Sequence, residues 1–279
     1  MSWKAPAKVN LFLHVLNKRQ DGYHDIFSLM QKISLYDELS FSPCASGIIL
    51  HCSDKTLPID EKNLVVRAAK AIFEHCGYSG GVEIRLIKKI PLTAGLGGGS
   101  SDAATTLKAL NRIFSFGLTK DQLMKLGAKL GADVPFFIFG NKALAFGIGD
   151  DLRRAPSIPK LNFLLINPPF ELSTKMVYEN LNLRLTSRKN NYSISQFLAL
   201  GDIIEELHND LESVSLKIYP ELAVLKKMLL HCGALGALMS GSGPTVFGIF
   251  RNEKEAKQAL NVIEKKLHGK ANVILARSL

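Results

Sequence analysis

Residues 91–104 read Pro91-Leu92-Thr93-Ala94-Gly95-Leu96-Gly97-Gly98-Gly99-Ser100-Ser101-Asp102-Ala103-Ala104. Four of the five residues from 95 to 99 are glycine, so the backbone there carries almost no side chains and can adopt positive φ angles. Apolar residues at helical spacing predict a helix after the run, with Ser100, Ser101 and Asp102 as N-capping groups. Free amides and the positive end of the helix dipole therefore meet at the glycines, an arrangement suited to a polyphosphate.

A flexible surface linker is the simpler explanation of this glycine run. A linker would continue in Gly and Ser, whereas this run begins at a proline and leads into a periodic apolar helix. No Gly-Lys-Ser/Thr closes the run, so it is not a Walker A loop, and it lacks the spacing and acidic partner of a Rossmann turn. We therefore predict a phosphate loop of another type.

The composition is that of a soluble globular protein. The chain has 279 residues, of which 47% are hydrophobic and 22% charged, enough for one large or two ordinary domains. The composition changes near residues 150–160, and we predict domains over 1–153 and 154–279. Since no apolar run reaches the roughly 18–20 residues that span a bilayer, we expect no membrane association. Four cysteines without a Cys-x-x-Cys pair predict free thiols in a reducing cytoplasm.

The net charge of +10 favours anionic partners in general. The basic residues are dispersed, however, and no run of five or more of them is present. We therefore expect no nucleic-acid partner, although a phosphorylated substrate would benefit from the charge. The sequence leaves the oligomeric state open.

Hydrophobic periodicity predicts the order of the main elements. Residues 7–15 alternate as a strand with one buried face, which places Lys8 and Asn10 together on the other, polar face. The apolar run over 136–139 is predicted to be a strand. Thr119 to Gln122 form a capping-box pattern at the start of a helix. Residues 162–276 follow the order β-α-β-β-α-β of a ferredoxin-like unit, with Thr174 as a helix cap and a basic loop over 184–193.

The glycine run resembles the phosphate loop of the GHMP kinases, which include galactokinase, homoserine kinase and mevalonate kinase. Their pattern is Pro-x-x-x-Gly-Leu-x-Ser-Ser-Ala, which is lengthened here by glycines. Gly131-Ala132-Asp133-Val134-Pro135 and Gly241-Ser242-Gly243-Pro244-Thr245 resemble two further motifs of the family. The resemblance implies a two-domain α+β fold, with an N-terminal domain like ribosomal protein S5, a C-terminal ferredoxin-like domain and a cleft between them.

The resemblance also implies a phosphotransferase site that uses ATP and Mg²⁺. Residues 91–101 would bind the triphosphate, and either Ser100 or Ser101 would place its hydroxyl on the Mg²⁺ or on a phosphate oxygen. Asp133 matches the catalytic aspartate of the family, which accepts the proton of the acceptor hydroxyl. Lys8 would keep that aspartate ionised and stabilise charge on the transferred group.

Two further stretches resemble one branch of the family, whose members phosphorylate the 2-hydroxyl of a cytidine diphosphate-linked methylerythritol in isoprenoid precursor synthesis. They are Pro-Ala-Lys-x-Asn-Leu at residues 6–11 and Arg-x-Asp-Gly-Tyr-His at residues 19–24. By this resemblance Tyr23 would stack on cytosine, His24 would bind its edge and Tyr178 would close the other side. Asn10 and Thr174 would contact the acceptor. A kinase for homoserine or mevalonate, or a non-catalytic nucleotide or nucleic-acid binder, remains the alternative.

Overall fold

The structure is a computed structural model that describes residues 2–183 and 199–279. Contacts within the chain define two compact units. Unit 1 comprises Met1–Ala7, Leu35–Pro91 and Gly97–Asn141. Unit 2 comprises Lys8–Ser34, Leu92–Leu96 and Lys142–Leu279. The domain division predicted from the sequence, 1–153 and 154–279, stays a prediction, and the predicted loop over 184–193 lies outside the described residues.

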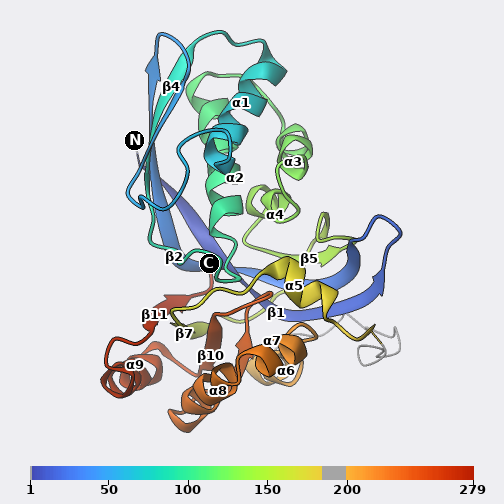
Figure 1. The fold of residues 1–279 in the computed structure, drawn as a ribbon, viewed down its shortest axis with the longest axis vertical. Helices are drawn as coiled ribbons and strands as arrows, with labels where there is room; N and C mark the ends of the chain where they lie inside the picture. Colours follow the sequence, from blue (N-terminus) through green and yellow to red (C-terminus); the bar gives the residue numbers. More distant parts are fainter. Residues whose placement is uncertain (1, 184–198) are drawn as a thin grey trace. The chain divides into compact units, whose positions relative to one another are not determined.

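Two long strands, β1 (Ser2–Lys18) and β2 (His24–Cys44), contribute residues to both units (Figure 1). β1 confirms the strand predicted over 7–15, but the prediction that only one of its faces is buried is wrong. Lys8 and Asn10 are only 5% and 1% exposed. The alternation in the sequence indicates which side chains are polar and not which are exposed. These polar side chains are buried because each makes a hydrogen bond inside the protein.

The sheet of unit 1 is built on the second half of β2. There β4 (Gly81–Ile87) pairs antiparallel with β2, from Glu38↔Ile87 to Cys44↔Gly81. On its other edge β4 pairs parallel with β3 (Ile48–Cys52). Parallel neighbours need a crossover, which α1 (Leu64–Cys76) provides.

The helices of unit 1 start and stop at recognisable capping residues. At the start of α1, Asn63 accepts a hydrogen bond from the Val65 amide, and Gly77 ends the helix in the left-handed conformation at φ 63°. The predicted capping box of Thr119 and Gln122 is confirmed at the start of α3 (Lys120–Ala128). α1 packs against α2 (Gly98–Ile113), the helix that follows the glycine run.

Two sequence predictions in unit 1 are wrong. The apolar run over 136–139 belongs to a helix, α4 (Val134–Phe139), because Pro135 lies in its first turn, where its missing amide proton and fixed φ suit a helix start. The caps expected of Ser100, Ser101 and Asp102 are absent, because α2 begins earlier. Its N-cap is Gly97, at φ 69°, which makes no side-chain hydrogen bond.

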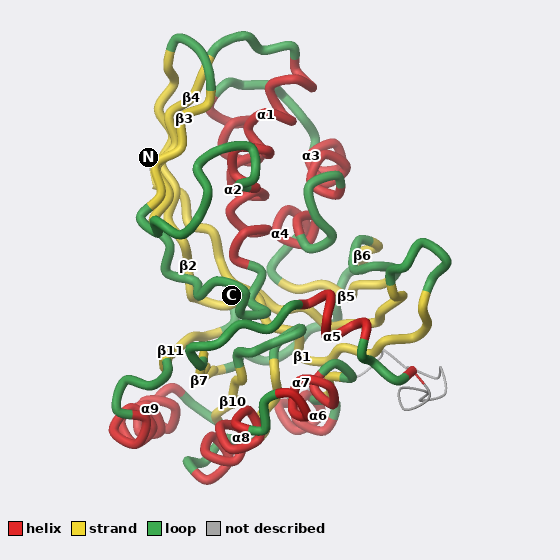
Figure 2. The backbone as a smooth tube through the Cα atoms, viewed as in Figure 1, coloured by secondary structure: helices red, strands yellow, loops and turns green. Residues whose placement is uncertain are grey.

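Unit 2 contains the predicted ferredoxin-like arrangement. Its antiparallel strands are β7 (Asn162–Asn167), β9 (Gly236–Met239), β10 (Val246–Phe250) and β11 (Asn272–Arg277), in the order β11-β7-β10-β9. Figure 2 labels three of them, β7, β10 and β11. α8 (Glu221–His231) and α9 (Glu253–Leu267) contact each other and both contact β10, so they cover the same face of this sheet.

Shorter elements of unit 2 lie along β1 and β2. β5 (Lys142–Phe146) pairs antiparallel with the first half of β2 and with β6 (Asp151–Arg153). β8 (His208–Asn209) pairs parallel with β1. The remaining helices are α5 (Thr174–Glu179), α6 (Leu200–Glu205) and α7 (Glu212–Ile218).

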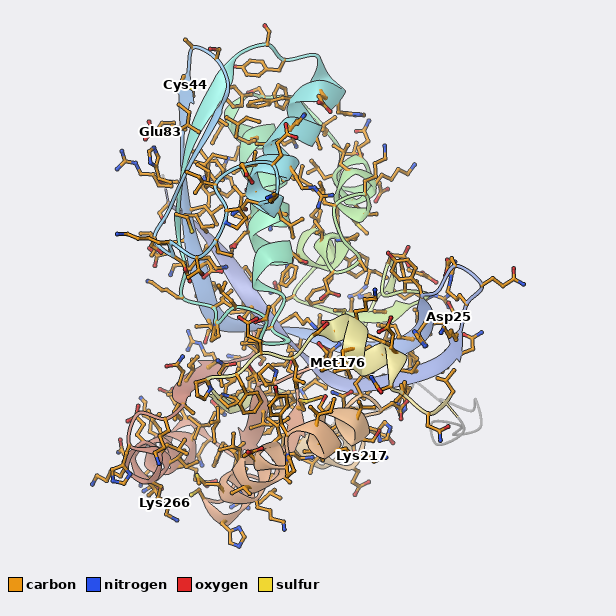
Figure 3. All side chains as sticks on the ribbon, viewed as in Figure 1. Asp25, Cys44, Glu83, Met176, Lys217 and Lys266 are labelled. Atoms are coloured by element: carbon orange, nitrogen blue, oxygen red, sulfur yellow. The ribbon has the colours of Figure 1, made fainter. Side chains whose placement is uncertain are left out.

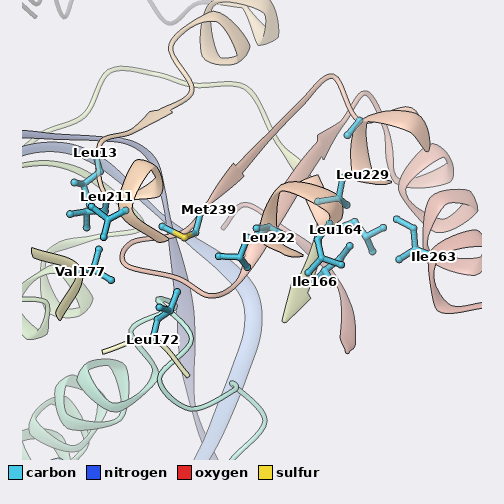
Figure 4. Packing of buried hydrophobic residues seen from close by; sticks show 14 of the residues in the cluster. Leu13, Leu164, Ile166, Leu172, Val177, Leu211, Leu222, Leu229, Met239 and Ile263 are labelled. Atoms are coloured by element: carbon cyan, nitrogen blue, oxygen red, sulfur yellow. The ribbon is translucent and has the colours of Figure 1, made fainter. Parts of the chain in front are cut away.

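One apolar cluster joins these elements of unit 2. It combines side chains of β1, of the four-stranded sheet and of the helices around it (Figure 4): Leu13, Leu164, Ile166, Leu172, Val177, Leu211, Leu222, Leu229, Met239 and Ile263. Burying each such side chain is worth about 1.5–3 kcal/mol. The cluster therefore fixes the β1 residues of this unit against the ferredoxin-like sheet.

The basic residues are dispersed, as the sequence predicts. Lys217 on α7 and Lys266 on α9, for example, are exposed on different helices (Figure 3). Among the described residues, no helix has both the length and the hydropathy needed to cross a bilayer.

Candidate functional site

The last three glycines of the run, Gly97 to Gly99, form the N-cap and the start of α2 in unit 1. Ser101 donates the first intrahelical hydrogen bond, from its amide to the Gly97 carbonyl at 2.9 Å. The amides of Gly98, Gly99 and Ser100 precede it and have no acceptor within the helix. Three amides at the positive end of a helix, two of them on glycines, form a binding place for an anion such as phosphate.

A buried cluster of charges lies beneath this turn. The Lys88 ammonium binds Asp37 and, at 2.8 Å, Asp102 of α2. A second Asp37 oxygen accepts hydrogen bonds from the amides of Lys89 and Ile90 at 2.5 and 2.8 Å. A Cβ at Gly98 would lie 3.3 Å from the Lys88 nitrogen, so the ammonium contacts the start of α2. The cluster therefore fixes the segment before the glycine run to the helix that follows it.

The pKa values within this cluster are shifted by burial and by the neighbouring charges. Burial raises the pKa of Asp102 to about 8; the Lys88 charge opposes this rise and the Asp37 charge adds to it. Burial alone would lower the pKa of Lys88, but the two carboxylates raise it above its ordinary value. Lys88 is therefore charged at neutral pH, and Asp102 gives up its proton less readily than an ordinary carboxyl group.

The two serines of the glycine run have different surroundings. Ser101 is fully buried, and within the described part of the chain its hydroxyl has no hydrogen-bond partner; the same is true of Asp102 Oδ1. Hydroxyl and carboxylate oxygens are the ligands that Mg²⁺ takes, so the donor chemistry fits this ion. The Ser100 hydroxyl is half-buried and lies 4.0 Å from the position of a Cβ at Gly131.

Asp133 also belongs to unit 1 and lies at the end of the turn that begins at Gly131. The Val134 amide closes this turn with a hydrogen bond to the Gly131 carbonyl at 3.1 Å, and Asp133 occupies the N-cap position of α4. Because Ser100 adjoins Gly131, unit 1 brings the predicted base into the neighbourhood of the glycine turn. The sequence predicted both elements, and their proximity within one unit agrees with a shared site.

Lys8 and Asn10 lie in unit 2 and are joined by a chain of hydrogen bonds. The Lys8 ammonium donates to Asn10 Oδ1 at 2.7 Å, and the Asn10 amide donates to the Ser28 hydroxyl at 2.8 Å. Ser28 in turn donates to the Phe12 carbonyl at 2.6 Å. This chain holds the predicted catalytic amine and the predicted acceptor-binding amide side by side. Lys8 and Asp133 belong to different units, and their predicted meeting stays a prediction.

The two glycine-rich loops meet inside unit 2. The Ser240 hydroxyl donates to the Gly95 carbonyl at 3.0 Å, and the Lys8 amide donates to the Leu96 carbonyl at 2.9 Å. A Cβ at Gly95 would lie 2.0 Å from the Ser240 carbonyl oxygen, and a Cβ at Gly241 would lie 3.5 Å from the Lys8 nitrogen. The approach at Gly95 requires glycine, because any Cβ there would overlap the Ser240 carbonyl oxygen, whereas 3.5 Å at Gly241 is an ordinary contact distance.

The residues predicted to bind cytidine are partly brought together. The rings of His24 and Tyr178 lie 5.1 Å apart, centroid to centroid, whereas Tyr23 is 60% exposed. Burial, with a smaller effect of the Lys18 charge, lowers the pKa of His24, so its ring is neutral at pH 7. The sequence predicted Thr174 as the N-cap of α5, but Ser173 occupies that position. The Thr174 hydroxyl instead lies 2.8 Å from that of Ser242, in the second glycine-rich loop.

One group of side chains that could hold a metal ion includes none of the predicted site residues. Within the described ranges, ligand atoms of His14, His208 and Asp210 lie within 4.8 Å of one another. The two imidazole rings are stacked, with 4.6 Å between centroids and 14° between planes. Lone pairs of stacked rings lie in separate planes, so one ring would have to rotate before both could bind a single ion.

The buried charge cluster and Asn209 were not predicted from the sequence. Asp37, Lys88 and Asp102 lie far apart in the sequence, and no local pattern marks them as partners. Asn209 joins β8 to the second glycine-rich loop. An asparagine followed by aspartate is usually a turn signal, and its sequence context gave no indication of a long-range contact.

Comparison with known proteins gives matches along most of the chain. The profile described as GHMP kinases N terminal domain matches residues 63–141, and that described as GHMP kinases C terminal matches residues 191–269. The chain is 58% identical over 261 residues to 4-diphosphocytidyl-2-C-methyl-D-erythritol kinase from Syntrophus aciditrophicus, with 94% of each chain covered. It is 49% identical over 260 residues to the enzyme of the same name from Syntrophotalea carbinolica, with 92% of each covered.

Solved structures give the same result at the level of the fold. A crystal structure of 4-(cytidine 5'-diphospho)-2C-methyl-D-erythritol kinase superposes with a TM-score of 0.84 at 34% identity, covering 100% of this chain and 99% of the other. Homoserine kinase from Cytophaga hutchinsonii superposes with a TM-score of 0.75 at 21% identity, covering 100% and 94%, a likeness of fold alone. These matches confirm the predicted α+β fold of two family domains.

Proposed function

The chain belongs to the GHMP kinase family, and on that premise we propose that it transfers the γ-phosphoryl group of ATP to the 2-hydroxyl of 4-diphosphocytidyl-2-C-methyl-D-erythritol. The observation that carries the proposal is the 58% identity, over 94% of each chain, to a kinase named for this acceptor. The reaction is a step in the formation of isoprenoid precursors.

The nucleotide is held at the start of α2. Amides of Gly98, Gly99 and Ser100 donate to phosphate oxygens, and the helix dipole supports the negative charge. Ser100 or Ser101 would hold Mg²⁺, which would supply positive charge to neutralise the phosphates. Pro91 and residues 92–96 lead into this turn, and the contact of Gly95 with Ser240 fixes their course.

Lys8 and Asp133 act on the transferred group and the acceptor. The bond from the γ-phosphorus to its bridging oxygen breaks and leaves ADP, while a bond forms to the acceptor 2-oxygen. Asp133 takes the hydroxyl proton as this bond forms and later returns it to solvent. The Lys8 cation, held by Asn10, stabilises the charge that develops on the transferred group and the acceptor oxygen.

The acceptor is selected through its cytidine half. An aromatic ring close to an imidazole offers one stacking face and one hydrogen-bonding edge, as a pyrimidine requires, and His24 and Tyr178 supply this pair at 5.1 Å. Exposed Tyr23 covers the second face of the base, and the hydroxyl of Thr174 contacts the acceptor.

A coupled assay of ADP release tests the proposal. The purified chain is supplied with ATP, Mg²⁺ and, in separate reactions, the cytidine-linked acceptor, homoserine or mevalonate. ADP release with the first acceptor alone is expected. Release with homoserine or mevalonate alone would assign another kinase activity, and release with none, together with salt-sensitive RNA binding, would favour a nucleic-acid binder.

Variants of the two reacting side chains test their roles. Lys8→Met and Asp133→Asn are expected to keep the fold and ATP binding while turnover falls by about 10²–10⁴-fold. Circular dichroism and calorimetric titration of ATP establish the first two points. Near-normal turnover in either folded variant would refute the role given to that residue.

A further inference from the structure

The second glycine-rich loop lies beside the proposed catalytic lysine. Gly241 lies at φ 56°, in the left-handed region, and a Cβ there would come within 3.5 Å of the Lys8 nitrogen and 3.6 Å of Asn10 Oδ1. The backbone of this loop therefore forms one wall around the ammonium group. A shift of the wall by a fraction of an ångström would change the space in which Lys8 lies.

Asn209 supplies two of the hydrogen bonds that hold this wall. Its side-chain amide donates to the Met239 carbonyl at 2.8 Å and to the Gly241 carbonyl at 2.7 Å. Its Oδ1 accepts from the Leu211 amide at 3.0 Å, which fixes the orientation of the amide group. The side chain is 5% exposed, so water does not replace these bonds readily when they are lost.

The segment that carries Asn209 is itself attached to the strand that carries Lys8. Leu13 of β1 pairs with Asn209, and the Asp210 amide donates to the Leu13 carbonyl at 3.0 Å. The Asp210 carboxylate accepts from the Val15 amide at 2.7 Å. β1 thus determines the position of Lys8 directly and that of Gly241 through Asn209.

We propose that Asn209 is a positioning residue for phosphoryl transfer, which sets the distance between the loop at Gly241 and the Lys8 ammonium. The inference rests on the proposed function for its kinetic consequence. Since Gly241 adjoins the groups assigned to the acceptor oxygen and the transferred phosphoryl group, displacement should lower kcat and have little effect on the KM for ATP.

Asn209→Asp isolates the donation from the rest of the side chain. The carboxylate keeps the shape of the side chain and the acceptor for the Leu211 amide. It places an oxygen, however, against the two carbonyls that accept hydrogen bonds from Asn209 in the original protein. Asn209→Ser, which can also accept from the Leu211 amide, removes the donor without adding charge. Asn111→Asp is the matched control, because Asn111 makes the same type of bonds to the amide and carbonyl of Leu118.

Two measurements are made on each folded variant, well below its melting temperature. Hydrogen exchange of peptides covering residues 236–246, without any substrate, reports the loop itself and needs no activity. It should become faster in both Asn209 variants and stay unchanged in Asn111→Asp. In the kinase assay kcat should fall by about 10–100-fold in the Asn209 variants, with the KM for ATP within about threefold of the original.

The outcomes separate the inference from the proposed function. Unchanged exchange in the loop, or faster exchange with an unchanged kcat, would overturn the positioning role while the wild-type activity stands. An equal fall of kcat in Asn111→Asp would also overturn it, because the effect would then be one of general stability. A wild-type protein without activity on the cytidine-linked acceptor would refute the proposed function. If hydrogen exchange of residues 236–246 were also unchanged in Asn209→Ser, the role of Asn209 in holding this loop would be refuted as well. If Asn209→Asp does not fold, Asn209→Ser decides the result.

Discussion

Replacing Gly95 by alanine tests the contact between the two glycine-rich loops. The new Cβ would lie 2.0 Å from the Ser240 carbonyl oxygen and 3.1 Å from the Gly243 amide nitrogen. Ordinary contacts of a Cβ begin at 3.4 Å, so the backbones would have to separate by about 1.4 Å, the difference between 3.4 and 2.0. Both neighbours are backbone atoms, which cannot turn aside as a flexible side chain can.

Two costs add in this variant. Alanine at the φ of +73° found for Gly95 costs about 1–2 kcal/mol, and crowding in a packed interior costs about 1–3 kcal/mol. We therefore expect the free energy of unfolding to fall by about 2–5 kcal/mol. The displaced loop should also weaken nucleotide use, with kcat/KM for ATP lower by about 10²-fold.

Gly117→Ala is the matched control for the backbone cost alone. Gly117 has nearly the same φ, +69°, but a Cβ there would meet no atom within 4 Å. Urea unfolding and steady-state kinetics are measured on both variants. If Gly95→Ala is no less stable than Gly117→Ala and keeps its kinetics with ATP, the close approach of Gly95 and Ser240 is refuted.

Further predictions concern the buried charges and the cytidine contacts. Because the pKa of Asp102 is raised to about 8 and the unfolded carboxyl ionises near pH 4, the folded protein holds an extra proton between these values, so its stability falls as pH rises through this window. Asp102→Asn should remove this fall between pH 5 and pH 8 in urea titrations, and parallel profiles for the two proteins would count against it. Tyr178→Ala should raise the KM for the cytidine-linked acceptor by about tenfold or more and leave the KM for ATP unchanged. Tyr178→Phe should behave as the original protein. Equal kinetics in the original protein and both variants would exclude stacking.

Elements with strong local signals were predictable from the sequence. The capping box of Thr119 and Gln122 lies where the sequence placed it, because the signal is complete within four residues. The ferredoxin-like unit was predictable from the order of its strands and helices along the chain. The glycine run predicted positive φ angles, and Gly95 and Gly97 have them, at 73° and 69°.

The wrong predictions have physical reasons of two kinds. Apolar content alone does not distinguish a strand from a buried helix, and the run over 136–139 was decided by Pro135 in the first turn of α4. In the same way, polarity did not predict exposure in β1, where Lys8 and Asn10 are buried because they bind each other. In both cases the apolar or polar character of the residues alone did not decide their structure or burial.

Some residues of the candidate site had no local signal. The hydrogen-bond partners of Lys88 lie 14 and 51 residues away in the sequence. Those of the Asn209 side-chain amide lie 30 and 32 residues away. Such partners become visible only when the fold places them together. The family motifs, by contrast, mark Lys8, Asp133 and the glycine turn as candidates in the sequence alone, because each motif is contiguous.

The position of the transferred phosphoryl group is the most direct test of the account. Carbon 2 of the acceptor carries a methyl group, so its hydroxyl is tertiary and a phosphate on it has no hydrogen on the attached carbon. After reaction of the purified chain with ATP and 4-diphosphocytidyl-2-C-methyl-D-erythritol, phosphorus NMR should show ADP and one new monoester signal without coupling to a carbinol proton. A new signal split by such protons, or no new monoester while ATP remains, would contradict the proposed function.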